Sequence, residues 1–276
     1  MAGKKIGVSL PFEILTDSVQ DNPACWELLS AYGGDLGQML CALHTGDVGS
    51  IELRAVNSTD PKLIARAVKS CTDAGLQAAI HGNMHTYNKP DDFFDQYSLL
   101  PASTRYIIVL HALKDMDSTV SALQDLAAYG DKNMPNLFFA LENERDKPGG
   151  TACQSCEKVA EALVSVAHPR VGACWDFGHF YNNVIKSTES ASLPEDFLDY
   201  VIHTHIHGLG LAGRMHFPID GSNLPIREYC NLLTGRDYAG VYNLELDFDR
   251  FYLNMEPRKS LEDSIDVLKQ ALDSQV

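Results

Sequence analysis

Short blocks of apolar residues recur along this chain, and a longer stretch with helical periodicity follows most of them. The clearest block ends at Asp176, where Val171, Ala173 and Trp175 alternate with smaller or polar residues. Alternation over about six residues is typical of a β-strand. We therefore expect a buried strand that ends on a carboxylate and is broken by Gly178.

The strand and helix patterns repeat eight times. Strands are predicted over residues 4–10, 48–53, 76–80, 105–110, 136–141, 171–176, 201–205 and 241–245. The most regular helical patterns cover residues 61–74, 118–129, 151–167, 225–233 and 259–272. Strands that alternate with helices pair in parallel through right-handed crossovers. Eight such units in 276 residues predict an α/β fold, a single (β/α)8 TIM barrel that forms one domain over residues 1–276.

Composition and charge exclude several classes of protein. Hydrophobic residues make up 45% of the chain, which is enough for a sizeable core. The formal net charge of −15, from 22 basic and 37 acidic residues, disfavours nucleic-acid binding, which needs Lys and Arg to neutralise phosphates. The chain lacks a secretion signal and an apolar run of membrane-spanning length, so we expect a cytoplasmic protein without a membrane partner.

The cysteines give little sign of a special role. Their number, seven, is odd, and reduced thiols are expected. Cys153 and Cys156 form a CxxC motif within a predicted helix, but no second Cys or His pair accompanies it. Ordinary helix residues are therefore the preferred interpretation over a zinc site.

Polar residues able to bind metal recur where the predicted strands end, roughly every 30 residues, which is about the length of one βα unit. They are Glu52, His81, His111, Glu142, Asp176, His205 and Glu245. Chemistry in a TIM barrel is placed at the carboxyl ends of the strands, so these side chains are expected to share a cavity. Crowded carboxylates and imidazoles favour a divalent metal, Zn²⁺, Mn²⁺, Mg²⁺ or Co²⁺. A polar core held only by hydrogen bonds is the alternative.

Several single assignments stay open at this point. His203, His205 and His207 alternate on one face of a strand, so one or two of them at most are expected to be ligands. Glu52 is either a site residue or the partner of an interior ion pair. Arg214 and His216 lie in a Gly-rich loop, where they would either cover an anionic substrate or be solvated.

The chain resembles the xylose isomerase-like TIM-barrel superfamily, which includes sugar-phosphate isomerases and epimerases and the apurinic-site endonucleases. The resemblance covers nearly the whole chain. The motifs that carry it are LEN at 141–143, DFGH at 176–179, HIH at 205–207, HFPIDGSN at 216–223 and LEL at 244–246.

This resemblance implies roles for individual residues. The metal-binding residues of the family fall on Glu142, Asp176, His205 and Glu245, and a substrate-contacting histidine falls on His179. In the ketose epimerases of the group, the two metal-bound glutamates also exchange protons with the substrate. The implied reaction is proton transfer by Glu142 and Glu245 through an enediolate that the metal stabilises, with His216, Arg214 and Glu52 as further substrate-binding candidates.

The chain also departs from the family at informative positions. Eight residues resemble most of the three-zinc ligand set of the endonucleases, namely His81, His111, Glu142, Asp176, His179, His205, His216 and Glu245. The loop Asp that completes that set is absent, because Gly213, Arg214 and Met215 stand before the loop histidine. The arginine that some ketose epimerases carry soon after the metal-binding histidine is replaced by Leu211.

These observations predict a metal-dependent sugar or sugar-phosphate isomerase or epimerase. Its expected partner is a small sugar or sugar phosphate, and a homo-oligomer is compatible with the sequence. Two alternatives remain. One is a hydrolase of phosphate esters that holds a second metal at His81 and His111. The other is a carbohydrate-binding barrel without catalytic activity.

Overall fold

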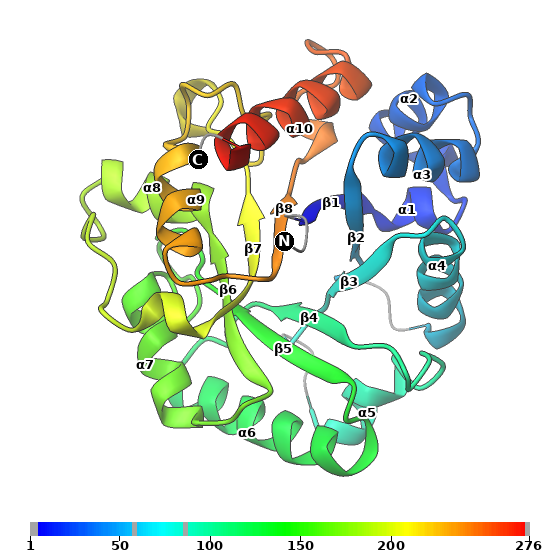
Figure 1. The fold of residues 1–276 in the computed structure, drawn as a ribbon. Helices are drawn as coiled ribbons and strands as arrows, with labels where there is room; N and C mark the ends of the chain where they lie inside the picture. The colour runs from blue at the N-terminus through cyan, green and yellow to red at the C-terminus, as the bar shows by residue number, and fades with distance from the viewer. Residues whose placement is uncertain (1–4, 57–59, 85–87, 274–276) are drawn as a thin grey trace. The chain divides into compact units, whose positions relative to one another are not determined.

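The computed structural model describes residues 5–56, 60–84 and 88–273, and over these residues eight parallel strands close into a barrel in sequence order (Figure 1). The predicted (β/α)8 TIM barrel is therefore confirmed. The first predicted strand began at Lys4, which lies outside the described residues. The strands are β1 (Lys5–Pro11), β2 (Val48–Arg54), β3 (Gln77–His81), β4 (Tyr106–Leu110), β5 (Leu137–Glu142), β6 (Val171–Asp176), β7 (Val201–Ile206) and β8 (Val241–Leu244).

Helices connect these strands. The α-helices are α1 (Phe12–Leu15), α2 (Pro23–Ala31), α3 (Leu36–Thr45), α4 (Pro61–Asp73), α5 (Pro90–Asp95), α6 (Met116–Asn133), α7 (Cys156–Val166), α8 (Phe177–Ile185), α9 (Ile226–Thr234) and α10 (Pro257–Asp273). Short 3-10 turns lie at η1 (Val19–Asp21), η2 (Phe197–Tyr200), η3 (Leu211–Gly213) and η4 (Phe248–Arg250). None of the helices in the described ranges is both long and apolar enough to cross a membrane.

The region after β6 differs from its prediction. Gly178 was expected to break the strand, but helix α8 begins at Phe177 and contains Gly178. Asp176 makes this possible because its Oδ1 accepts a hydrogen bond from the backbone N–H of His179 at 2.7 Å, which caps the first turn of the helix. All six residues of β6 are buried rather than every second one, as is usual for a strand covered on both faces.

Two compact units are distinguished within the chain, and the prediction of one domain over residues 1–276 stays a prediction. The first, here called the terminal unit, comprises Met1–Arg54, Arg66–Ala78 and His205–Val276. In it β1 pairs in parallel with β2 and β8, with Ser9 opposite Glu52 and Gly7 opposite Asn243. Helix α10 packs against α2 and α9.

The second unit, here called the middle unit, comprises Ala55–Ala65 and Ala79–Thr204. Strand β5 pairs with β4 and β6, and helices α6 and α7 pack on each other beside these strands (Figure 1). The ring of Trp175 contacts Phe177, Phe180 and Phe197, with centroid separations of 4.5, 5.8 and 6.2 Å. This aromatic core fixes the point at which β6 passes into α8.

A glycine allows two strands of the middle unit to approach each other. A Cβ atom at Gly172 would lie 2.6 Å from the carbonyl oxygen of Tyr200 and 2.8 Å from a side-chain carbon of Ile202. No side chain fits there without displacing the start of β7. The small residue in the middle of β6 is thus required by packing.

Candidate active site

Three of the predicted residues converge in the middle unit at the ends of β3, β4 and β5. Nε2 of His111 lies 3.2 Å from Nε2 of His81 and 3.1 Å from Oε2 of Glu142. The His81 nitrogen is 3.7 Å from the same carboxylate oxygen. His81 and Glu142 are buried, while the side chain of His111 is 27% exposed. Two imidazoles and a carboxylate within one ion's reach are a donor set suited to Zn²⁺ or another transition metal.

Asp176 and His179 extend this cluster. Nδ1 of His179 lies 3.3 Å from both Oε1 of Glu142 and Oδ2 of Asp176, and 3.0 Å from the backbone oxygen of Asn143. A carbonyl oxygen only accepts, so Nδ1 carries the proton in this hydrogen bond. In the neutral ring, Nε2 then has the lone pair, so Nε2 would accept a hydrogen bond from a substrate hydroxyl. His179 and Asp176 thus lie in contact at the start of α8, and the substrate contact of His179 stays a prediction.

Asn143 is a site residue for which no role was predicted from the sequence. Its amide nitrogen donates to the backbone oxygen of Asp176 at 3.0 Å, and its amide oxygen accepts from the backbone N–H of Asp176 at 2.7 Å. Both residues are fully buried. This two-way bond fixes the end of β6 against the end of β5 and so positions Asp176 beside Glu142. The signal in the sequence was the LEN motif, which was noted only for its glutamate.

Glu144 lies two residues after Glu142, the last residue of β5. Both are buried, but their contacts differ. Oε1 of Glu144 is 3.8 Å from Nδ1 of His111 and 3.8 Å from Nζ of Lys147, and its other oxygen accepts a hydrogen bond from Thr151. Glu144 therefore lies near Nδ1 of His111, whereas Glu142 lies near the Nε2 atoms of both His81 and His111.

A network of polar side chains holds the loop after β5. Asn183 of α8 donates to the backbone oxygen of Glu144 at 3.2 Å and accepts from the backbone N–H of Asp146 at 2.8 Å. Asn183 also donates to Glu189, whose carboxylate accepts the N–H of Cys156 at 2.6 Å. Burial raises the pKa of Glu189 above its usual range, and the hydrogen bonds from Cys156 and Asn183 oppose this effect.

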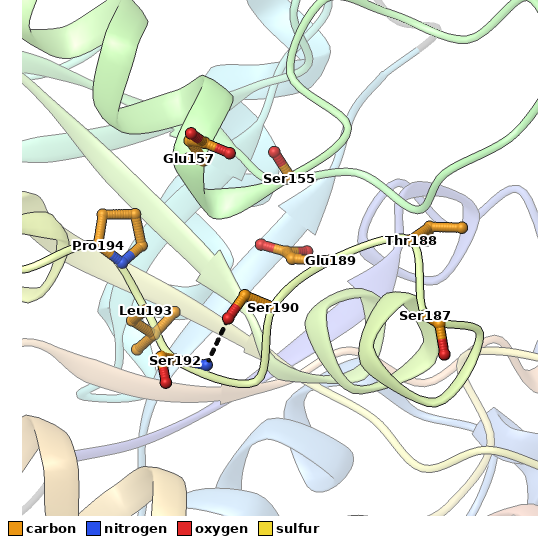
Figure 2. Close-up of a pocket in the computed structure, with 9 residues that line it drawn as sticks. All are labelled: Ser155, Glu157, Ser187, Thr188, Glu189, Ser190, Ser192, Leu193 and Pro194. Atoms are coloured by element: carbon orange, nitrogen blue, oxygen red, sulfur yellow. Dashed lines mark hydrogen bonds between the residues drawn. The ribbon is translucent and has the colours of Figure 1, made fainter.

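Glu189 also lines a surface pocket of about 540 Å³. Figure 2 shows Ser155 and Glu157 on one side of it, at the start of α7, and the segment from Ser187 to Pro194 on the other. Its lining includes none of the predicted site residues that the structure describes. We therefore assign Glu189 and Asn183 to support of the loop after β5 rather than to chemistry.

The terminal unit contains a second cluster, around His205. Its Nε2 is 3.0 Å from Oε2 of Glu52, and its Nδ1 is 3.4 Å from Oε2 of Glu245. Nδ1 of His216 lies 3.2 Å from the same Glu245 oxygen. Glu52, His205 and Glu245 are all buried at the carboxyl ends of β2, β7 and β8. Acids and histidines from neighbouring strand ends thus lie in contact within each unit, and one cavity shared by all seven residues stays a prediction.

Histidines of the HIH and HFP motifs have different neighbours. His207 packs its ring on that of His216 at a centroid separation of 4.2 Å and accepts the backbone N–H of His216 on Nδ1. His216 adopts a positive φ of 59°, which directs its side chain back toward Glu245. Of the three alternating histidines, His205 lies between two carboxylates, those of Glu52 and Glu245.

Arg214 lies in the loop after β7, apart from these contacts. Its backbone oxygen accepts the N–H of Gly210 at 2.7 Å, and its side chain is exposed. It lines a cavity of about 1010 Å³ together with Phe217, Arg250 and Phe251. A role over an anionic substrate stays a prediction for this residue.

The two cysteines of the CxxC motif belong to the buried core at the start of α7. Both thiols are free and buried, and Sγ of Cys153 contacts the backbone oxygen of Lys158. Burial, reinforced by the charges of Glu144 and Glu161, raises the pKa of Cys153 to about 12. The predicted helix around the motif is shorter than expected, since α7 begins at Cys156 and leaves Cys153 in the preceding loop.

Comparison with known proteins identifies relatives of the whole fold. A family model described as xylose isomerase-like TIM barrel matches residues 27–271. D-allulose 3-epimerase from Methylomonas sp. is 13% identical, with a TM-score of 0.62 and coverage of 98% of both chains. The 3-keto-D-glucoside 4-epimerase of E. coli is 15% identical, with a TM-score of 0.62 over 97% of this chain and 100% of that one.

Two further similarities are more distant in function or shorter in extent. The probable 3-DHS dehydratase of petrobactin synthesis from Bacillus anthracis is 13% identical, with a TM-score of 0.63 over 96% of this chain and 98% of that one. At such identities these structures share the fold alone. An uncharacterized protein of Methanocaldococcus jannaschii is 38% identical over 60 residues, and the match spans only 22% of each chain.

Proposed function

The chain belongs to the xylose isomerase-like TIM barrel family, and we propose that it is a divalent-metal-dependent sugar or sugar-phosphate isomerase or epimerase. The observation that carries the proposal is a pair of buried glutamates in similar surroundings. Glu142 of the middle unit is 1% exposed and contacts His179, while Glu245 of the terminal unit is 2% exposed and contacts His216. Two such carboxylates are what a reaction with two proton transfers requires.

The donor chemistry fits a hard or borderline divalent cation. Glu142 and Asp176 at the ends of β5 and β6, with His205 and Glu245 at the ends of β7 and β8, are the proposed ligands. When bound, the cation would polarise the carbonyl of the sugar and stabilise negative charge on its oxygen. Zn²⁺, Mn²⁺, Mg²⁺ and Co²⁺ are the candidates.

The protein side chains would handle the protons. One glutamate, Glu142 or Glu245, removes the proton next to the carbonyl, and the other returns a proton to the same or the adjacent carbon. His179 would bind a substrate hydroxyl through Nε2, since Nδ1 is held by Asn143. His216 and Arg214 would contact the distal part of the sugar. Their substrate contacts are predictions.

Relatives of this fold supply the first substrates to test. The D-allulose 3-epimerase has been crystallised in complex with D-allulose, a D-psicose 3-epimerase with D-tagatose, and a third relative is an L-ribulose 3-epimerase. The test uses protein purified without chelator, elemental analysis, and a panel of ketohexoses and ketopentoses with their phosphates. Incorporation of deuterium from D₂O next to the carbonyl is expected along with interconversion. Absence of turnover and exchange with each of the four metals would remove the proposal.

A phosphoesterase is the second candidate, because His81, His111 and Glu142 already form a three-donor cluster in the middle unit. Two-metal sites place their cations about 3.5–4 Å apart around a phosphoryl group. Hydrolysis of sugar phosphates with two equivalents of bound metal would favour this function. A carbohydrate-binding barrel without activity would bind sugars but show neither turnover nor deuterium exchange.

A further inference from the structure

Glu52 is fully buried on β2, and both of its carboxylate oxygens are engaged. Oε1 accepts a hydrogen bond from the hydroxyl of Ser9 at 2.7 Å, and Oε2 lies 3.0 Å from Nε2 of His205. The exposed fraction is 0% for both Glu52 and His205. This geometry distinguishes between the two roles left open by the sequence. A carboxylate that faces away from solvent behind an imidazole is poorly placed to bind a sugar directly.

The contact with Glu52 determines which nitrogen of His205 carries the proton. An ionised carboxylate only accepts hydrogen bonds, so Nε2–H donates to Glu52. In the neutral ring, Nδ1 then holds the lone pair. Nδ1 is also the nitrogen nearer Glu245, at 3.4 Å from Oε2. The lone pair and the Glu245 carboxylate therefore face the same position.

We propose that Glu52 is a positioning residue that fixes the tautomer and the ring orientation of His205 for metal binding. This inference rests on the proposed function, in which His205 and Glu245 are ligands. Carboxylates that accept the second N–H of a metal-binding histidine raise its basicity, and their loss typically costs 10–100-fold in metal affinity.

Two further residues hold Glu52 in place. The side-chain amide of Asn243 on β8 donates a hydrogen bond to the Ser9 hydroxyl at 2.8 Å, and this hydroxyl donates in turn to Glu52. Ser9 and Asn243 are both 0% exposed. A Cβ at Gly7 would lie 2.7 Å from the amide oxygen of Asn243, so the glycine on β1 leaves room for this side chain. The network thus runs from Asn243 through Ser9 and Glu52 to His205.

The test measures Co²⁺ binding to metal-free protein by competition with a chelator, in the absence of sugar. Glu52→Met removes the acceptor at similar volume, whereas the amide oxygen of Glu52→Gln can still accept from Nε2–H. We expect Glu52→Met to weaken Co²⁺ binding about 10–100-fold, Glu52→Gln to weaken it less, and Ser9→Ala to change it a few-fold. The stoichiometry at saturation should stay that of the wild type, and the visible spectrum of bound Co²⁺ should shift in Glu52→Met.

Glu262→Gln is the matched control, because Glu262 is an exposed glutamate on α10 of the same unit that pairs with Arg258. Its Co²⁺ affinity should equal that of the wild type. Equal affinity and spectrum in Glu52→Met would overturn the inference. If that variant fails to fold, equal affinity in both Glu52→Gln and Ser9→Ala would overturn it. Wild-type protein that binds Co²⁺ tightly but converts no sugar would refute the proposed function and leave the role of Glu52 standing.

Discussion

The two units group the same kinds of side chain around different central residues. In the middle unit one carboxylate, Glu142, has histidine nitrogens at 3.1, 3.3 and 3.7 Å. In the terminal unit one imidazole, His205, has carboxylate oxygens at 3.0 and 3.4 Å. A neutral imidazole can donate to only one of two carboxylates, and the second then meets a lone pair. A cation stabilises that second arrangement more than the first, so the terminal unit has the greater need for a metal.

The comparison is first tested at Glu142 and Glu245, two buried glutamates, one from each unit. Glu142→Gln and Glu245→Gln should each lower turnover of a converted sugar by about 10²–10⁴-fold, because each removes one of the two proton-transfer groups. The variants should differ in exchange. Without the group that returns the proton, the remaining base can still exchange the substrate proton with D₂O, so one variant should incorporate deuterium without epimerising.

Nuclear magnetic resonance of the sugar in D₂O measures both reactions in one sample. Lys158 pairs with the exposed Glu161 on α7, so Glu161→Gln serves as a control with the same change of charge. Should Glu142→Gln and Glu245→Gln both keep wild-type turnover, proton transfer belongs to other residues.

The second test concerns the metal itself. Asp176→Ala should lower metal affinity by more than about 100-fold, because a direct ligand contributes more than the outer partners whose loss costs 10–100-fold. The helix cap on α8 is lost as well, at a cost of about 1 kcal/mol, so the protein should remain folded. Elemental analysis and circular dichroism measure the two effects. Asp125→Ala, on the exposed face of α6, is the control, and a fully metal-loaded Asp176→Ala protein would contradict the assignment.

The third test asks whether the histidine-rich cluster holds a metal of its own. We expect one equivalent per chain, and His81→Ala should leave that number unchanged, because the imidazoles around Glu142 can satisfy its charge without a second cation. Metal titration followed by mass spectrometry under non-denaturing conditions counts the ions. Two equivalents in the wild type, with one lost in His81→Ala, would instead support the phosphoesterase.

The sequence predicted the barrel well because period and residue type agree in each unit. The run that ends at Asp176 and the acids and histidines after other strands needed only the rule that strand ends converge. The helix that begins at Phe177 was not predicted, because Gly178 was expected only to break the strand. A capping aspartate can start a helix directly at a strand end, and a glycine can lie within the first turn of that helix. The roles of Asn143 and Ser9 were missed because they depend on partners 33 and 43 residues away. Histidine tautomers and paired amide hydrogen bonds leave no periodic pattern in the sequence from which they could be predicted.

The smallest expected effect is the slow alkylation of the buried cysteines, which reports whether the middle-unit cluster stays closed. Cys153 adjoins Glu144, whose backbone N–H it accepts at 2.9 Å, and burial raises the pKa of Cys153 to about 12. The raised pKa leaves about one thiolate in 10⁴ at pH 8, and only the thiolate reacts. Cys41 on α3 is the exposed cysteine among the seven. Iodoacetamide should therefore modify about one thiol per native chain.

Peptide mass spectrometry identifies the modified residue, and Cys41→Ser should abolish the fast reaction. All seven thiols should react once the chain is unfolded. Fast labelling of Cys153 or Cys156 in the native protein would mean that the loop after β5 opens, because Cys153 lies within that loop and Cys156 begins the helix that follows it. The hydrogen bonds of Asn183 would then fail to hold Glu144 beside His111. The contrast between the two units would in that case apply to only one conformation of the middle unit.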